Sequence, residues 1–432
     1  MSRIPQPEVH VEGQHSPEGT PVGVAGGVKR ARLRSVAAAL TSLVALAATG
    51  LVAGPAVAST LAGPCALPRT PAHHSLGVDS WNSAYPRPDR NLDAVMIFLS
   101  FPDSVPRNSP DELAADHFPA TSRFFERASY GKFALRPHPQ RQWVPMPKAS
   151  TAYGIRRDWD SARRGAYLRD AVTAADPAVD FSRYDIVYLV ADPDASGVDA
   201  DATKVVNLDR PLTADGTDIK RVVTVFERHP PDRNVLAHET GHVFDLADLY
   251  HRPADGKGDW DTYVGDWDVM GSQFGLAPDL FAWHKWKLGW LDRAAVRCVQ
   301  KTELITLEPV AAAPSPGGSL GTRLAVVRTG EDTALAIEAR ASTGNDESTC
   351  TEGVLLYRVR AETASGSGPI EVVDTHPDSE ACWDESVYPP LADAPLGVGE
   401  TFTTPGAPGE RTRVEVRDRT RMGAWTVKIT TA

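Results

Sequence analysis

The chain has 432 residues, of which 42% are hydrophobic and 23% are charged, and its formal net charge is -11. This composition is ordinary for a globular protein, and the length is sufficient for two full domains or one large domain with a smaller partner. Since the balance is acidic and no basic patch dominates, nucleic acid is excluded as an expected partner.

The first 58 residues carry the pattern of a secretory signal peptide. A basic cluster at residues 29–34 precedes an apolar run, which closes on the small-residue sequence Ala56-Val57-Ala58. This order predicts cleavage after Ala58 and a secreted, extracellular protein without a stable membrane anchor. A retained anchor is the alternative. Residues 1–27 are polar and rich in Pro and Gly, so Val28 is a candidate for the true translation start.

The next part of the chain mixes strand and helix patterns. Residues 59–90 are rich in Pro, Ser and Ala and are expected to form an extended lead-in. Short apolar runs predict buried strands, and helical spacing with turn residues predicts helices between them. Asp232, after two prolines, is the expected N-cap of a further helix. We therefore predict an α+β domain over residues 91–296, with strands at 92–101, 132–137, 184–192 and 220–228 and helices at 121–130 and 159–175.

The pattern changes after Trp290. Trp283, Trp286 and Trp290 fall at helical spacing and are expected in the core. Beyond them come short runs of alternating residues, separated by Gly, Pro, Ser and Asp, which are typical of an all-β sandwich. We place this second domain over residues 297–432, with strands expected at 302–310, 322–329, 333–341, 353–361, 369–374 and 424–431.

Four cysteines remain after the predicted signal cleavage. An even number in an exported chain suggests disulfide bonds, and three pairings are possible. We favour Cys350 with Cys382, which lie in one segment, and Cys65 with Cys298 by elimination. No two of them have the close spacing of a cysteine metal site.

The stretch LAHETGHVFDLADLY, residues 236–250, carries the strongest functional signal. On a helix, His238 and His242 lie on one face, so two imidazoles can reach one ion. Glu239 stands beside the first ligand and can reach a water on that ion. This HExxH spacing is that of two zinc ligands and a general base. The alternative is an exposed helix with two solvated histidines, which the neighbouring residues argue against.

A catalytic zinc needs a third protein ligand, and Asp245 and Asp248 are the nearby candidates. If the helix ended near Asp245, the chain could turn and bring Asp248 back to the metal. Such a turn requires a residue that tolerates positive φ, and after Gly, Asp is one of the few. We therefore expect Asp245 in the turn and Asp248 as the ligand, with the opposite assignment left open.

These residues resemble the extended zinc motif of the metzincin peptidases, most closely that of the immune inhibitor A-like secreted metalloproteases. The family has glycine where this chain has Asp245, and then Asp-Leu-Tyr, as at residues 248–250. VGDWDVMGS is similar to the family's Met-turn segment, which implies that Met270 packs beneath the metal without binding it. The likeness covers about residues 94–360, through FLSFPD, FFERASYGKFAL, APDLFAWHKWKLGWL, ALAIEARASTG and GVLLYRVR.

The resemblance implies a zinc endopeptidase with a metzincin-like catalytic domain, acting on proteins or peptides, and we expect a monomer. The tyrosine that some metzincins use to bind the oxyanion is absent after Met270, and Tyr250 is a candidate substitute. The alternative function is a secreted binding module or adhesin with an inactive or structural zinc site. An intact Glu239 argues against that alternative, because a structural site does not need a base.

A weaker signal lies in the loop ADPDASGVDADAT, residues 191–203, which contains Asp192, Asp194, Asp199 and Asp201. Carboxylates are suitable ligands for calcium, so the loop is a candidate calcium site. Its spacing does not match the EF-hand loop, and a solvated acidic loop is the favoured interpretation. The sequence predicts no role for the histidine pair at residues 73–74.

Overall fold

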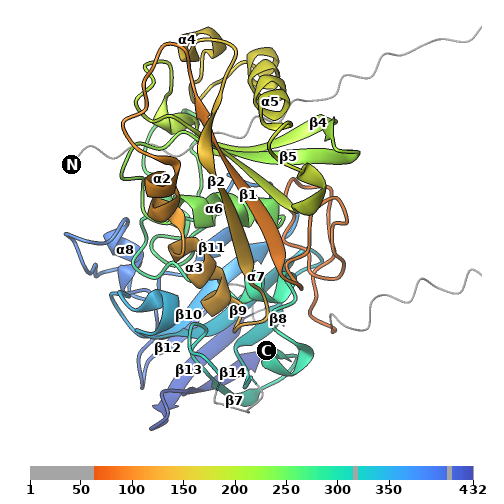
Figure 1. Cartoon of the computed structure of the whole chain (residues 1–432). Coiled ribbons are helices and arrows are strands. Elements are labelled where there is room, and N and C mark those ends of the chain that lie inside the picture. The colour runs from red at the N-terminus through yellow and green to blue at the C-terminus, as the bar shows by residue number, and fades with distance from the viewer. Residues whose placement is uncertain (1–62, 315–319, 406–410, 432) are drawn as a thin grey trace, which may run out of the picture. The chain divides into compact units, whose positions relative to one another are not determined.

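The computed structural model describes residues 63–314, 320–405 and 411–431, and the predicted signal peptide lies outside them. The described chain contains three sheets and few helices (Figure 1), which is compatible with the predicted α+β class. Within the described ranges, no helix is both long enough and apolar enough to pass through a membrane.

The first sheet lies in the upper part of Figure 1 and contains the four strands predicted before residue 230. Three of its four strand pairings are parallel. In the fourth, the edge strand β4 runs antiparallel to β5. Strand β4 was not predicted, because its side chains are mostly half-exposed or exposed and form no apolar run. The order is β2 (Leu135–Pro145), β1 (Leu92–Ser100), β3 (Ile186–Ala191), β5 (Thr217–Val225) and β4 (Lys204–Ala214).

The central strands β1 and β3 are buried on both faces of the sheet, since successive side chains of a strand point to opposite sides. On β1, Met96 and Phe98 belong to one hydrophobic core and Val95 and Ile97 to another. Three predicted helices and α2, which was not predicted, supply the covering layers. Helix α5 (Ser161–Ala175) packs into the core of Val95 and Ile97, while α2 (Pro110–His117), α3 (Ala120–Ala128) and α6 (Val235–Val243) contribute to the other.

Helix α6, which carries the HExxH motif, starts differently from the prediction. The residue before it is Asn234, whose φ of 59° is left-handed and whose side chain makes no capping hydrogen bond. The predicted N-cap, Asp232, was wrong, because the chain turns two residues later. The Asp232 carboxylate instead accepts a hydrogen bond from Nε2 of Gln273 at 3.2 Å.

The C-terminal part is a two-sheet β-sandwich, as the alternating runs predicted. All six predicted segments contain a strand, and the structure adds β6, β12 and β13. One sheet has the order β11 (Ile370–Val372), β10 (Gly353–Arg360), β9 (Thr333–Arg340), β8 (Leu324–Arg328) and β6 (Val296–Cys298). The other has the order β12 (Thr401–Thr403), β13 (Thr412–Arg419), β14 (Trp425–Thr431) and β7 (Glu303–Leu307).

The five-stranded sheet of the sandwich is also buried on both faces. On β10, Leu356 packs with Val427 of the other sheet in the core of the sandwich. Its neighbours Leu355 and Tyr357 belong to the same core as Met96 of the first sheet. The hydrophobic core therefore continues across residue 297, where the sequence suggested a domain boundary.

The three tryptophans at helical spacing are buried, as predicted. Trp283 and Trp286 lie on α7 (Ala282–Lys287), and Trp290 follows it. The indole of Trp283 donates a hydrogen bond to the carbonyl oxygen of Leu76 at 2.9 Å, and a second indole bond ties residue 290 to the carbonyl of residue 88 at 2.8 Å. These bonds hold the lead-in against the folded chain.

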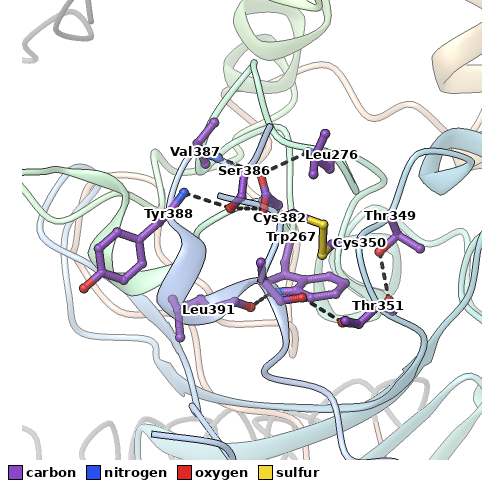
Figure 2. Close-up of a disulfide and its surroundings, with 12 residues drawn as sticks. Trp267, Leu276, Thr349, Cys350, Thr351, Cys382, Ser386, Val387, Tyr388 and Leu391 are labelled. Carbon is purple, nitrogen blue, oxygen red and sulfur yellow. Dashed lines mark hydrogen bonds between the residues drawn. A yellow bond between two sulfur atoms is a disulfide. The ribbon is translucent and has the colours of Figure 1, made fainter. Parts of the chain in front are cut away.

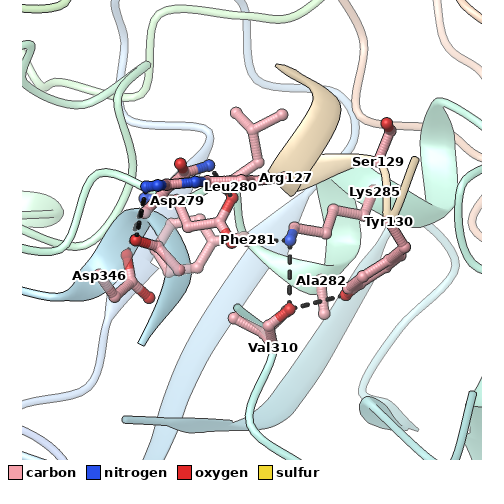
Figure 3. Close-up of polar contacts among 12 residues, drawn as sticks. Arg127, Ser129, Tyr130, Asp279, Leu280, Phe281, Ala282, Lys285, Val310 and Asp346 are labelled. Carbon is pink, nitrogen blue, oxygen red and sulfur yellow. Dashed lines mark hydrogen bonds and ion pairs between the residues drawn. The ribbon is translucent and has the colours of Figure 1, made fainter. Parts of the chain in front are cut away.

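A buried set of charges joins α7 to the sandwich. Nζ of Lys285 lies 2.8 Å from the carboxylate of Asp279 and donates to the carbonyl oxygen of Val310 at 3.2 Å (Figure 3). The backbone N–H of Asp279 donates to Asp346 at 2.8 Å. Burial raises the pKa of Asp346 to about 7, against the opposing charge of Arg340. Loss of any one partner would leave a buried charge uncompensated.

Both predicted disulfides are present, with Cα–Cα distances of 5.7 Å for Cys65–Cys298 and 6.2 Å for Cys350–Cys382. Two disulfides are consistent with a protein that folds in an oxidising compartment. Figure 2 shows the second bridge beside Trp267, whose indole donates to the carbonyl of residue 391 at 2.8 Å. The bridge therefore fastens the segment around Cys382 next to the predicted Met-turn.

Removal of the Cys350–Cys382 bridge is expected to destabilise the protein. The two residues are 32 apart in sequence, and a bridge across a loop of this size stabilises by about 2–5 kcal/mol, so the double Ser variant should unfold at lower urea concentration. A urea titration without reductant measures the difference. Peptide mapping of the unreduced wild type is the control, and free thiols at both positions there would contradict the assignment.

Candidate metal centre

Three buried side chains bring one ligand atom each to a common point. Nε2 of His238 lies 3.2 Å and Nε2 of His242 lies 3.0 Å from Oδ1 of Asp248. The two Nε2 atoms are 3.2 Å apart. Among the residues that the structure describes, this is the one group of three or more His, Cys, Asp or Glu side chains with such convergence. We call these three residues the metal centre.

The spacing of the metal centre fits a tetrahedral ion. With ligand distances of about 2.0–2.1 Å, two ligands of a tetrahedral zinc lie about 3.3–3.4 Å apart. The observed separations of 3.0–3.2 Å are close to this requirement. Two imidazoles and one carboxylate form a donor set typical of zinc sites that keep one position open. The group can therefore hold a divalent ion, and its donors suit zinc.

Backbone carbonyls orient both imidazoles. Nδ1 of His238 lies 2.8 Å from the carbonyl oxygen of Val269, and Nδ1 of His242 lies 2.8 Å from that of Leu246. A carbonyl oxygen only accepts, so each Nδ1 donates the hydrogen and each Nε2 is left to face the centre. Ring orientation of this kind is what a metal ligand requires.

Electrostatics in the metal-free chain favour a cation at the same point. Burial works to lower the pKa of His242, but the charge of Asp248 outweighs burial and raises that pKa to about 9. Burial works to raise the pKa of Asp248, but His242 and hydrogen bonds from both histidines hold it well below its usual range. The carboxylate therefore remains ionised and draws positive charge to the group.

The turn after α6 has the geometry expected from the roles predicted for Asp245 and Asp248. The helix ends at Val243, and Asp245 has a φ of 61°, in the left-handed region. The N–H of Leu246 reaches back to the carbonyl of Gly241 at 3.1 Å, which reverses the chain direction. Asp248 then returns to the two histidines, as expected for the third ligand.

Asp245 also has a second role that the sequence did not indicate. Its carboxylate is fully buried and lies 3.1 Å from Arg69, 2.9 Å from His74 and 3.4 Å from Lys287. Burial works to raise the pKa of Asp245, but His74 and the nearby cations lower it to about 2. The imidazole of His74 also stacks on His242, with ring centroids 5.6 Å apart. The lead-in is therefore part of the site. The sequence analysis gave no role to its histidine pair at residues 73–74.

The candidate base Glu239 is 3% exposed and held by the edge strand. The N–H of Val205, at the start of β4, donates to Oε2 of Glu239 at 2.9 Å. Burial raises the pKa of Glu239, against the charges of the two histidines. One oxygen is therefore anchored, and Oε1 remains for proton exchange.

Met270 packs against the helix that carries the HExxH motif. It is fully buried, and a Cβ added to Gly241 would lie 2.4 Å from its Sδ. Only glycine in the middle of the HExxH motif permits this close packing. The N–H of Leu249 donates to the carbonyl oxygen of Met270 at 2.9 Å. Met270 thus contacts both α6 and the segment that follows Asp248, and its predicted place beneath a bound metal stays a prediction.

Tyr250, the candidate oxyanion helper, contacts a ligand. The side chain is 3% exposed. Burial, followed by the charges of Asp248 and Glu239 and a hydrogen bond to Asp248, raises the pKa of Tyr250 well above its usual value. This contact favours a role in holding Asp248, and the predicted oxyanion role stays a prediction.

The four aspartates of the candidate calcium loop do not converge. Asp192 accepts hydrogen bonds from Oγ of Ser104 at 2.7 Å and from the N–H of Asp194 at 3.0 Å. Asp199 accepts one from the N–H of Asp201 at 3.1 Å, as a local cap. Within the described chain, no three of these carboxylates meet at ligand distance. The geometry gives the calcium prediction no support.

A comparison of the sequence with protein-family models and with curated proteins finds no match. The chemistry of the site is therefore inferred from its own residues. Two imidazoles and one carboxylate share a point, and a second, anchored carboxylate lies next to the first ligand in the chain. Such an arrangement can bind a metal and move a proton beside it.

Proposed function

We propose that this chain is a secreted zinc-dependent endopeptidase of the metzincin type, similar to the immune inhibitor A-like metalloproteases. One observation carries the proposal: the ligand atoms of His238, His242 and Asp248 converge, and the carboxylate of Glu239, the residue after His238 in the chain, is anchored by the N–H of Val205. Three protein ligands leave a tetrahedral ion one open position, which a catalytic site needs and a structural site fills. The two disulfides and the predicted signal peptide support export.

In the proposed reaction, zinc would supply Lewis acidity, which polarises the peptide carbonyl and lowers the pKa of a water to about 7. Glu239 accepts the proton of the attacking water. Because Val205 fixes Oε2, the proton is taken at Oε1. The burial that raises the pKa of Glu239 helps the carboxyl to hold the proton until the leaving amine receives it.

Removal of the metal is expected to abolish proteolysis. Purified protein should digest casein, lose this activity when a chelator strips the metal, and regain it when zinc is added back. Peptide mapping of the fragments identifies the bonds that are cut. A serine-protease inhibitor is the control against contamination and should have no effect. Digestion that continues after elemental analysis shows the metal to be gone would overturn the proposal.

A further inference from the structure

The loop between β10 and β11 of the sandwich lies along the segment that carries the third ligand. The N–H of Gly366 donates to the carbonyl oxygen of Asp248 at 3.0 Å, and that of Gly368 donates to Tyr250 at 3.0 Å. The N–H of Arg252 returns a bond to the carbonyl oxygen of Gly366 at 3.2 Å. The sandwich therefore reaches the metal centre through paired backbone.

Ser365, at the start of this pairing, forms hydrogen bonds with Asp248, the third ligand residue. Its hydroxyl donates to Oδ2 of Asp248 at 3.0 Å and accepts from the backbone N–H of Asp248 at 2.9 Å. Its own N–H donates to the carbonyl oxygen of His73 in the lead-in, at 3.1 Å. Ser365 thus connects the sandwich, the lead-in and the third ligand.

The two oxygens of Asp248 have different partners. Oδ2 is taken by the hydroxyl of Ser365, whereas Oδ1 faces Nε2 of His238 and His242 at 3.2 and 3.0 Å. The terminal torsion of an aspartate is soft, so backbone geometry alone does not fix which oxygen faces the centre. The serine hydroxyl contributes to this selection, beside the hydrogen bond between Tyr250 and Asp248.

We infer that Ser365 is a positioning residue for the metal centre: it holds Oδ2 of Asp248 and leaves Oδ1 as the single ligand atom. The inference rests on the metal-binding part of the proposed function. Partners that orient a ligand typically change metal affinity by about 10–100-fold when removed. By this route the β-sandwich contributes directly to the metal centre, although none of its residues is a ligand.

The test compares Ser365→Ala with two variants in the full-length secreted protein. Ser365→Thr keeps a hydroxyl, and Ser367→Ala removes one from an exposed residue of the same loop. Zinc affinity is measured by competition with a chromophoric chelator. The visible absorption of the Co²⁺-loaded protein reports coordination number, and the melting temperature of the metal-free protein reports folding.

We expect Ser365→Ala to weaken zinc binding about 10–100-fold. Its Co²⁺ absorption should also fall, because a released Oδ2 permits a fifth contact. Ser365→Thr and Ser367→Ala should resemble the wild type. Wild-type affinity in Ser365→Ala, or a loss of affinity matched by loss of the metal-free fold, would overturn the inference. A wild type that binds zinc without cleaving casein would overturn only the peptidase proposal, and one that binds no zinc would overturn both.

Discussion

Glu239→Gln is expected to leave the fold and the zinc content intact while peptidase activity falls by about 10²–10⁴-fold or more. Glutamine has the same shape, and its amide oxygen can still accept the N–H of Val205, which now lies 2.9 Å from Oε2. An amide cannot take the proton of the attacking water, so the chemical step loses its base. Elemental analysis and casein digestion of the same sample measure the two quantities.

The outcome of this substitution separates the two classes of function. Loss of activity with retained metal supports a role for Glu239 in the reaction. Comparable activity would remove Glu239 from the mechanism, and a wild type without activity would favour the binding module or adhesin. Since Glu239 is 3% exposed, the melting temperature must accompany the assay to exclude a misfolded variant.

The candidate ligand set was predictable because local geometry determines which side chains converge. Residues four apart on a helix share a face, so the convergence of His238 and His242 follows from their spacing alone. The division between the aspartates was also predictable, since few residue types accept positive φ and Asp245 is one of them. Both inferences depend on contacts within a dozen residues of the motif.

The supporting residues were not predictable, because they are distant in sequence. Ser365 is 117 residues from Asp248, and Arg69 is 176 residues from Asp245. A single serine or arginine carries no periodic signal, and only the fold brings it to the site. Strand β4, which provides the contact between Val205 and Glu239, was also not predicted, because it contains no apolar run.

The hydrophobic core that the first sheet shares with the sandwich was only partly predictable from the sequence. Strands β9 and β10 contain the apolar runs at residues 334–337 and 354–357, and their side chains are almost all buried. Such runs are typical of strands covered on both faces, whereas a sandwich with one open face shows clean alternation. The predicted alternation therefore did not reveal that β9 and β10 are covered on both faces, because the core that covers them depends on tertiary contacts.

Asp245→Gly is expected to destabilise the protein, although glycine suits the φ of 61° and is the residue found in the resembling family. The substitution removes the carboxylate that compensates Arg69 and the buried Lys287 and that pairs with the imidazole of His74. An uncompensated buried charge typically costs about 3–5 kcal/mol, so the free energy of unfolding should fall by that order. Asp248→Ala is the matched comparison: it should lose zinc after dialysis, by about 10–100-fold or more in affinity, because it removes a ligand. Urea titration and metal analysis of both variants decide the assignment. If Asp245→Gly loses the zinc with unchanged stability while Asp248→Ala keeps it, the roles of the two aspartates are reversed.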